Sequence, residues 1–590
     1  MTRRISLSPL LAVLSLLIAL LLRVVDLGAL PLMPAEAAAA LEAAARSSMG
    51  TPFWEGGSAA VAPSYLTPTS ALMTAFGVRT MVARLVPALA GAMLVALPLL
   101  LRRRLGWPVT LLTMGLLAVS TASLTASRTA GGETMAVLGV ALAVVLIGRS
   151  AVLTKTERIL AGAGLGLALA SGSAAWMGFF GLGLAVLFGK LIRAGDPPRN
   201  PHDPPLGSPA ALFNYEVLIS AAVISVLLST AFGTQPRALT GFLAAPGRWL
   251  LGWGNPSGWS LISGFFVLLV YEPLLLILGG VGVVGALRRG PALERLAALW
   301  ALGALTVYLL YPARNPLDIL WLVVPLSLLT ASQVIRTVEA IQKLEMPLSS
   351  LMLALVLLVI FSYAFLQLEA SLAGFGLASL DREAQLVFAL SALGFALLLV
   401  LLFGVGWSWR ETLLALAASA TVVLAMLSVS SSWRLNYTRQ AVETSELWRR
   451  EVTTLQLPLL EETLSEIAKT VVGRTGGMPI EVIGDPTASL AWGLREHKPA
   501  SQALMGEDAP AVEAPPVIIA RETVQPSLPA DYLGQAYAIK GHWGWPAGVP
   551  TNPLQWLMDR QGPLELERWI LYVRTDVAAF GTQPDGTEVE

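Results

Sequence analysis

Long apolar runs separated by short polar segments fill residues 1–431 of the chain. A transmembrane helix needs about 20 mainly apolar residues, with a range of roughly 17–25. The runs 159–172 and 174–190 are read as two helices, and the alternative is one long helix with a kink between the two runs. Counted separately, they bring the expected number of membrane-spanning helices to about 13, at residues 6–23, 80–101, 107–126, 134–148, 159–172, 174–190, 214–232, 261–287, 296–311, 317–332, 348–368, 384–405 and 411–430.

Basic residues between the apolar runs indicate how the chain is oriented, because cytoplasmic loops carry an excess of Lys and Arg. With the N-terminus in the cytoplasm, the inner loops contain Arg102–Arg104, Arg149, Lys155, Arg158, Lys190, Arg193, Arg288, Arg289, Arg336 and Lys343. The outer loops keep only single arginines. Residues 333–346 have the pattern of an amphipathic helix lying on the inner surface. We therefore expect a multi-pass plasma-membrane protein with a cytoplasmic N-terminus.

The composition changes after residue 431, where apolar runs give way to mixed segments. Helices are predicted at 433–451 and 457–472, at 487–496 after an N-cap at Asp485, and near 552–560. Strands are predicted at 479–484, 517–520, 535–540 and 569–574. The sequence thus predicts two parts: an α-helical polytopic membrane domain over residues 1–431, and a C-terminal α/β extracytoplasmic domain over residues 432–590. The second part has no catalytic motif of its own.

Composition narrows the classes of chemistry open to the chain. Of its 590 residues, 13% are charged and 55% are hydrophobic, whereas soluble domains have roughly 25% charged residues. The formal net charge is zero, which gives no argument for nucleic-acid binding. There is no Cys, so disulfides and thiolate chemistry are excluded, and the three His are far apart. We therefore predict neither a metal site nor a cofactor.

Three predicted outer segments are longer or more polar than tight turns require: 24–79, 126–133 and 233–260. The first contains Glu36, near the start of an Ala-rich helical stretch. A carboxylate at the membrane interface is suited to deprotonate an acceptor hydroxyl. It equally suits the first turn of a helix, where it interacts with the helix dipole. The third segment contains Trp249, Trp253 and Trp259, which suit an interfacial belt better than a sugar platform.

Charged residues at the ends of the predicted spans are candidates for ligand contacts. Arg128 and Glu133 occupy the second segment, and Arg314 occupies a similar outer turn. An arginine there can hold a lipid-linked phosphate through paired hydrogen bonds, with Glu133 as a second acid. The alternative is a salt-bridged turn between two helices. Arg23 and Asp26 are expected to pair and to shape the first loop rather than to react.

Three groups of residues together resemble a known family. The first group is Arg23, Asp26, Leu27, Gly28, Pro31, Leu32, Ala35 and Glu36. The second is Tyr65, Phe76, Gly77, Arg84, Leu85, Pro87, Ala88 and Gly91, and the third is Ser127, Arg128 and Glu133. In order and spacing they resemble the GT-C superfamily of glycosyltransferases, and in particular its dolichyl-phosphate-mannose protein mannosyltransferase-like branch. Residues 485–498 also look like a segment of outer domains in this group.

This resemblance implies a mechanism for the chain. A polyprenyl-phosphate sugar enters from the bilayer, and Arg128 or Arg314 holds its phosphate. An acid in the first outer loop activates the hydroxyl of a protein or glycan acceptor, and an inverting displacement transfers the sugar. The family's Asp-Glu pair reads Ala35-Glu36 in this chain, so the acid usually credited with catalysis is absent. In one reading, Glu36 together with Glu133 takes the place of this acid. The other readings are a non-catalytic scaffold relative and a lipid or polysaccharide transporter.

Overall fold

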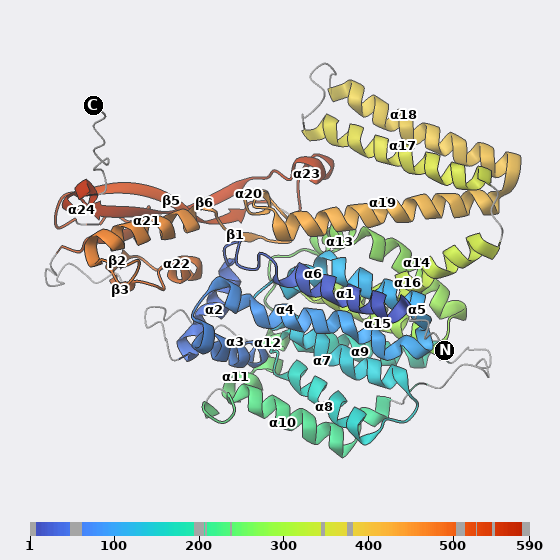
Figure 1. Cartoon of the computed structure of the whole chain (residues 1–590), viewed down its shortest axis with the longest axis horizontal. Coiled ribbons are helices and arrows are strands. Elements are labelled where there is room, and N and C mark those ends of the chain that lie inside the picture. The colour runs from blue at the N-terminus through green and yellow to red at the C-terminus, as the bar shows by residue number, and fades with distance from the viewer. Residues whose placement is uncertain are drawn as a thin grey trace, which may run out of the picture.

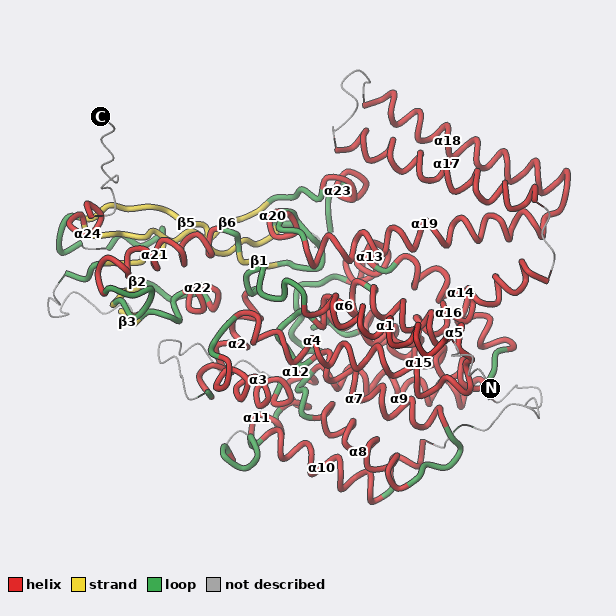
Figure 2. Tube along the Cα trace, viewed as in Figure 1, coloured by secondary structure: helices red, strands yellow, loops and turns green. Residues whose placement is uncertain are grey.

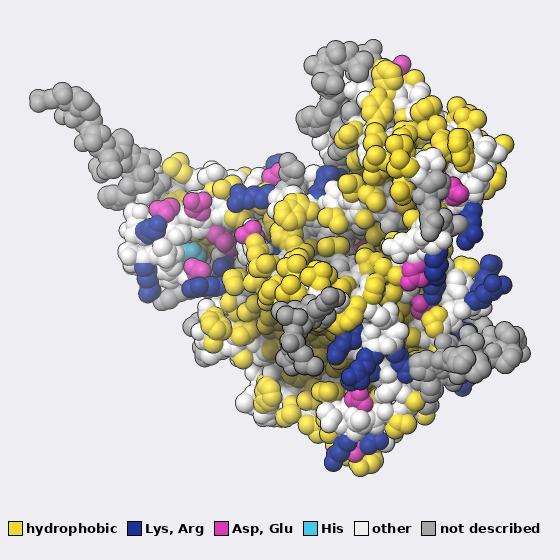
Figure 3. Space-filling view, turned by 45° about the vertical axis from the view of Figure 1, so that its right-hand side comes forward, with side chains coloured by type: hydrophobic (Ala, Val, Ile, Leu, Met, Phe, Trp, Pro, Cys, Tyr) yellow, Lys and Arg dark blue, Asp and Glu magenta, His cyan; other side chains and the backbone are white. Residues whose placement is uncertain are grey.

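A bundle of helices carries a mixed α/β domain at one end, as a computed structural model of the chain shows (Figure 1). The structure describes residues 7–47, 62–193, 206, 209–236, 239–343, 348–373, 382–502, 514–526, 528–545 and 549–580. Part of the predicted first outer loop, residues 48–61, lies outside these ranges. Hydrophobic side chains cover much of the bundle surface visible in Figure 3, whereas charged side chains gather on its right and lower side in this view and on the C-terminal domain.

The bundle contains nineteen α-helices within the described residues. They are α1 (Leu7–Val24), α2 (Pro34–Arg46), α3 (Pro63–Phe76), α4 (Thr80–Ala96), α5 (Arg102–Val119), α6 (Thr121–Ser127), α7 (Glu133–Arg149), α8 (Lys155–Leu169), α9 (Ala174–Arg193), α10 (Tyr215–Ser229), α11 (Leu239–Leu243), α12 (Ala245–Leu251), α13 (Leu261–Tyr271), α14 (Pro273–Arg289), α15 (Ala292–Leu310), α16 (Leu320–Lys343), α17 (Leu348–Ala373), α18 (Arg382–Phe403) and α19 (Trp409–Tyr437).

Seven helical segments of the described residues are long and apolar enough to cross a membrane, or eight if the bent pair α13 and α14 forms one span. Every predicted apolar run coincides with helix, and the protein is a helical membrane protein. The larger predicted number of spans is not confirmed. Runs 159–172 and 174–190 are separate helices, α8 and α9, because Gly172 between them has a φ of +74°.

Three predicted boundaries differ from the structure. The run 261–287 is not straight, because α13 and α14 meet at a 98° bend at Glu272. Glu272 precedes a proline, which disfavours helical backbone at that position. Residues 333–343 of the expected surface helix are instead the last part of α16, and residues 344–346 lie outside the described ranges. The loop 24–79 contains two helices, α2 and α3.

Close approach of neighbouring helices depends on small residues. A Cβ atom at position 139 on α7 would lie only 2.2 Å from the carbonyl oxygen of Gly164 on α8, so glycine is required there. In the same way, a Cβ atom at position 303 on α15 would lie 2.0 Å from the carbonyl oxygen of Gly181 on α9. Lipid tails are as apolar as the side chains of the bundle, so the packing of such surfaces is a main source of attraction between membrane helices.

The C-terminal domain is built on a six-stranded sheet of order β1-β5-β6-β4-β2-β3, the only strands of the described chain (Figure 2). β2 pairs in parallel with β3 and β4, and the other pairs are antiparallel. The elements are α20 (Gln440–Glu443), β1 (Glu451–Thr453), α21 (Gln456–Val472), β2 (Pro479–Ile483), α22 (Ala488–Gly493), β3 (Lys498–Gln502), β4 (Val517–Arg521), β5 (Tyr532–Trp543), α23 (Pro553–Asp559), β6 (Leu564–Arg574) and α24 (Thr575–Phe580).

The four predicted strands are confirmed as β2, β4, β5 and β6, and the helix at 457–472 as α21. The predicted helix 433–451 is wrong, because α19 continues from the bundle to Tyr437 and Glu451 already begins β1. The N-cap of α22 is Thr487 rather than Asp485. The Thr487 hydroxyl accepts the amide of Leu490 at 3.4 Å, as a threonine at this position commonly does.

The C-terminal domain is joined to the bundle through buried side chains. Trp492 on α22 and Trp556 on α23 belong to the apolar core of the bundle, whereas the sheet has a separate core against α21. The Thr453 hydroxyl donates to the carbonyl of Leu32 at 2.6 Å, just before α2. The Trp492 indole donates to Thr80 at 3.3 Å. These contacts fix the domain over the first loop.

Gly139→Ala should destabilise the protein, because its new methyl group would displace the backbone of α8. Overpacking of this kind costs about 1–3 kcal/mol. The control is Gly115→Ala on α5, where a Cβ meets nothing within 4 Å. The measurement is the unfolding temperature of the detergent-solubilised protein. A lower temperature is expected for Gly139→Ala alone, and equal temperatures would contradict the close packing of α7 and α8.

Candidate functional site

A cavity of about 270 Å³ lies where the C-terminal domain meets the bundle. Its wall comes from six parts of the chain: the start of α2 with the residues before it, α4, the end of α6 with the residues after it, the segment before α13, the turn before α16, and the segment from the end of α19 to β1. The lining residues are Leu30, Met33, Pro34, Ala35, Glu36, Arg84, Thr125, Arg128, Thr129, Trp259, Asn315, Pro316, Leu317, Asn436, Trp448, Arg449, Arg450 and Glu451.

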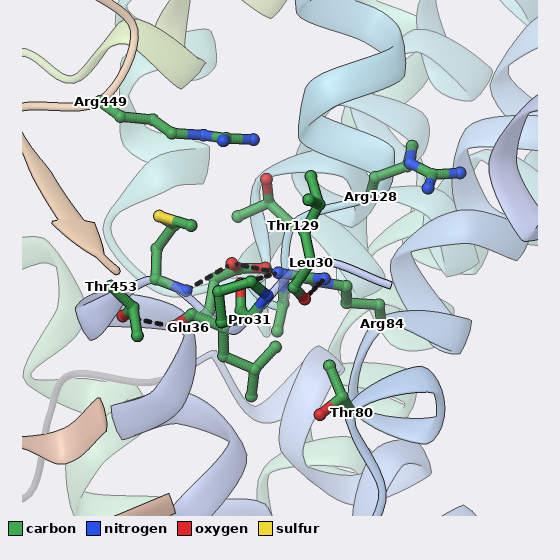
Figure 4. Close-up of polar contacts among 12 residues, drawn as sticks. Leu30, Pro31, Glu36, Thr80, Arg84, Arg128, Thr129, Arg449 and Thr453 are labelled. Atoms are coloured by element: carbon green, nitrogen blue, oxygen red, sulfur yellow. Dashed lines mark hydrogen bonds and ion pairs between the residues drawn. The ribbon is translucent and has the colours of Figure 1, made fainter. Parts of the chain in front are cut away.

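Glu36 lies at the base of this cavity and is 4% exposed. Its Oε1 accepts Arg84 Nε at 2.9 Å and the amide of Ala130 at 2.8 Å. Its Oε2 accepts Arg84 Nη2 at 2.7 Å and the amide of Met33 at 2.9 Å (Figure 4). Burial alone would raise the pKa of Glu36. The charge and hydrogen bonds of Arg84, with the two amides, outweigh burial and hold this pKa below its usual value.

Arg84 on α4 is the partner that organises the first loop. Besides its two bonds to Glu36, it donates to the carbonyls of Leu27 at 3.2 Å, Leu30 at 2.9 Å and Pro31 at 3.0 Å. All five N–H donors of a guanidinium are thereby engaged. The sequence comparison above placed Arg84 in a motif but gave it no role. A structural role for Arg84 could have been inferred from its position near the start of an apolar run. An unpaired charge is costly there, so a charged partner is expected.

Arg128 also lines the cavity, but its hydrogen bonds are directed at backbone. Its Nη1 donates to the carbonyls of Leu22 at 3.1 Å and Val25 at 2.8 Å, and its Nη2 donates to that of Asp26 at 3.0 Å. Its guanidinium also stacks on Tyr437, 4.6 Å from the ring centroid. Carbonyls at a helix end lack partners within the helix. Arg128 therefore caps α1 and ties it to the end of α19.

The other predicted site residues lie outside the cavity wall. Arg314 donates to the carbonyls of Tyr308, Trp259 and Leu309, and so caps the end of α15. Glu133 begins α7 and does not line the cavity. Arg23, which is fully buried, donates to the carbonyls of Ala19, Leu117 and Ala118 and to Ser123.

The expected pair of Arg23 with Asp26 is not present among the described residues. Arg23 turns instead toward α5 and α6, and the backbone carbonyl of Asp26 accepts from Arg128. Asp26 itself has a φ of +52°, a conformation that Asn and Asp adopt more readily than most residues. The first loop is thus shaped by Arg84 and Arg128, each of which binds its backbone.

The three tryptophans of 233–260 have different surroundings. Trp249 is buried and stacks on both Phe180 and Tyr311. Trp253 is exposed, and Trp259 lines the cavity. One of the three is therefore placed to meet a ligand.

Arg449 is the cavity residue that sequence reasoning missed. It reaches from the segment after α20 toward the space above Thr129 and Glu36 (Figure 4). Its Nη2 donates to the carbonyl of Leu435 at 3.1 Å, whereas its Nη1 is buried and has no hydrogen-bond partner among the described residues. Burial lowers the pKa of Arg449, but a guanidinium stays charged in proteins. A charged nitrogen without a partner in a cavity is suited to an anion.

Two neighbours of Arg449 complete this edge of the cavity. Arg450 donates to the carbonyl of Ser257 at 3.4 Å, and Glu451 pairs with Lys540 at 3.0 Å. Asn436, Thr125 and Thr129 add neutral polar groups to the wall. The arrangement favours an anionic ligand with further hydrogen-bonding groups. Within the described residues, no group of three or more His, Asp or Glu could hold a metal ion.

Glu36→Gln should unfold more easily than the wild type at neutral pH, because it leaves Arg84 buried without its charged partner. Breaking a buried ion pair costs about 3–5 kcal/mol. Because the folded-state pKa of Glu36 is depressed, the contribution is present above the ordinary carboxyl pKa of about 4.3 and is lost as the pH falls through the folded value.

The measurement is the unfolding temperature at pH 7 and at pH 4 and below. The matched control is Glu42→Gln on the same helix, which removes a partly exposed carboxylate paired with Arg46. We expect a lower unfolding temperature for Glu36→Gln alone, and a smaller difference between this variant and the wild type in acid. A deficit of the same size in both variants would contradict a special role for the Arg84 pair.

Comparisons with known proteins bear on the fold. No protein-family model and no curated protein sequence matches the chain. Two solved structures of ArnT from Cupriavidus metallidurans match 83% of this chain and 85% of theirs, each with a TM-score of 0.50. One is bound to undecaprenyl phosphate and is 14% identical, and the other is in the apo state and 16% identical.

The apo oligosaccharyltransferase of Archaeoglobus fulgidus is 14% identical and covers 84% of this chain and 64% of its own, with a TM-score of 0.41. That likeness is too weak to support an argument. The match to the ArnT structures extends over most of the length of both chains. The chain therefore shares the fold of these ArnT structures, as the resemblance drawn from the three sequence motifs implies.

Proposed function

We propose that the chain is a membrane glycosyltransferase that takes its sugar from a polyprenyl-phosphate donor. The observation that carries the proposal is the buried Arg449 Nη1. It has no hydrogen-bond partner within the described part of the chain, and Arg449 lines a cavity whose wall also contains Arg128 and Arg450. Arg–phosphate hydrogen bonds are strong and directional. The ArnT structure with the same fold, which contains undecaprenyl phosphate, supports this choice of anion.

In this proposal the donor phosphate lies against Arg449. The acceptor hydroxyl attacks the anomeric carbon of the sugar, the bond from that carbon to the phosphate oxygen breaks, and a base takes the hydroxyl proton. Negative charge grows on the departing polyprenyl phosphate. Donors fixed in advance where charge develops are a large source of rate acceleration. Arg449 is suited to this role because its Nη1 need not leave another partner first.

The base of this reaction must be a carboxylate that lines the cavity and is not already saturated with hydrogen bonds. Glu36 has both oxygens engaged by Arg84 and two amides, so a role in positioning suits it better than proton transfer. Ala35 beside it has no group to accept a proton. Glu133 does not line the cavity. Glu451 does, is 46% exposed at its side chain, and pairs only with Lys540 among described residues. We therefore favour Glu451 as the proton acceptor.

The proposal includes an orientation. Residues 1–431 would form the catalytic membrane domain of a plasma-membrane protein with its N-terminus in the cytoplasm, and residues 432–590 an extracytoplasmic domain over the cavity. The basic residues at the end of the bundle remote from this cavity support that arrangement through the positive-inside rule. The acceptor would be a protein or glycan hydroxyl on the outer side.

A second candidate function has one observation in its favour. A relative that binds polyprenyl phosphate without reacting needs the arginines but no base, and both Ala35 and the fully bonded Glu36 agree with this. Such a protein would serve as a scaffold or assembly partner. Binding and transfer must therefore be measured separately.

Arg449→Gln should weaken binding of undecaprenyl phosphate by about tenfold or more, the usual effect of losing a hydrogen bond from a charged group. The matched control is Arg474→Gln, which removes an exposed arginine of the same domain. The measurement is binding of undecaprenyl phosphate to the purified full chain in detergent. Equal affinity in both variants would contradict the role of Arg449.

Transfer is measured in membranes with a panel of radiolabelled polyprenyl-phosphate sugars. Wild-type transfer that is lost in Glu451→Gln, with binding of the lipid unchanged, would support the transferase and its base. Binding without transfer from any donor would favour the non-catalytic relative. Absence of both would overturn the proposal.

A further inference from the structure

A second polar hollow of about 160 Å³ lies at the end of the bundle remote from the first cavity. Its polar lining consists of Arg104, Glu294 and Ser332, and its apolar lining includes Leu105, Val109 and Leu293. Arg104 is at the start of α5, whereas Arg128 of the first cavity follows α6, so most of α5 and all of α6 lie between the two sites along the chain. Nothing in the proposed glycosyl transfer uses this hollow.

The charge around the hollow is strongly positive. Arg104 is held in place because its Nε donates to the carbonyl of Arg149 at 2.9 Å. The carboxylate of Glu294 is already bonded to Arg336, so it does not oppose an anion as a free charge. Exposed arginines follow on both sides in the sequence, at Arg102, Arg103, Arg288 and Arg289.

Ser332 indicates that the hollow is suited to a ligand. Its side chain is 4% exposed, it lines the hollow from α16, and its Oγ has no hydrogen-bond partner among the described residues. A buried hydroxyl without a partner costs free energy. A phosphate oxygen in the hollow would accept this hydroxyl proton and would also meet Arg104.

The hollow adjoins an apolar pocket of about 50 Å³ that extends along the bundle. The two share Leu293, and the pocket is lined from the same helices by Thr113, Leu296, Trp300 and Leu328. A basic polar hollow next to an apolar channel matches a molecule with an anionic head and a hydrocarbon chain. The small volume admits part of one chain, with the remainder in the bilayer.

We propose that this pair of pockets binds an anionic phospholipid, with its headgroup phosphate against Arg104 and Ser332 and the start of one acyl chain past Leu293. Basic pockets between helices on the cytoplasmic side of membrane proteins bind such headgroups. The positive-inside rule places this end of the bundle at the cytoplasmic leaflet. The site is separate from the donor cavity and does not depend on the proposed transfer reaction.

The test is native mass spectrometry of the delipidated full chain in detergent, titrated with phosphatidylglycerol. Phosphatidylcholine with the same acyl chains, undecaprenyl phosphate and inorganic phosphate are titrated in parallel. Phosphatidylglycerol should bind at least about tenfold more tightly than phosphatidylcholine. Arg104→Gln should remove most of this preference. The control, Arg103→Gln, removes the same charge from an exposed neighbour that does not line the hollow, and it should keep the preference.

A second variant protects the test against misfolding of Arg104→Gln. Leu293→Trp fills the junction of the two pockets without changing charge, and it should weaken phosphatidylglycerol binding while the lipid-free unfolding temperature stays near that of the wild type. Equal losses in Arg103→Gln and Arg104→Gln would mean a diffuse charge effect and would overturn the site. Tight binding of inorganic phosphate alone, or loss of undecaprenyl phosphate in step with phosphatidylglycerol, would overturn the assignment to a phospholipid.

Discussion

The buried pair of Arg84 and Glu36 is the interaction on which the first cavity depends. Arg84 fixes three backbone carbonyls between α1 and α2. Glu36 accepts from the amide of Met33, the N-cap of its own helix, and from that of Ala130, in the turn between α6 and α7. Each charge is expensive to bury alone, and the pair is stable because both are saturated with hydrogen bonds. The base of the cavity is therefore rigid before any ligand arrives.

Sequence patterns predicted the layout well, because apolar runs of spanning length and alternating strands are direct consequences of burial. The sequence patterns failed where a feature of a few residues, such as a proline or a polar segment, conflicted with the pattern of a longer stretch. The apolar run through Glu272 hid a bend, although the following proline was visible. The run of α19 beyond Ser432 was missed because polar residues on one face of a long helix resemble the start of a soluble domain.

Prediction of the site was limited by a different cause. Glu36 and Arg128 were predicted as site residues, and both line the cavity. The hydrogen-bond partners of an arginine, however, cannot be read from the sequence. Arg23, Arg84, Arg128 and Arg314 direct their guanidinium groups at backbone carbonyls in or next to helix ends. Arg449 was passed over because arginine is common after a last span. Only the fold shows that, among the described residues, one nitrogen of the Arg449 guanidinium has no hydrogen-bond partner.

The wall of the first cavity is assembled from residues near both ends of the sequence, since Met33 to Glu36 face Arg449 to Glu451. Thr453 and Trp492 hold these parts together through Leu32 and Thr80. A ribosome making this chain thus finishes the whole helical bundle before the site exists. Until the last quarter of the chain has been synthesised and has docked, the wall of this cavity is incomplete, because Arg449, Arg450 and Glu451 are not yet in place.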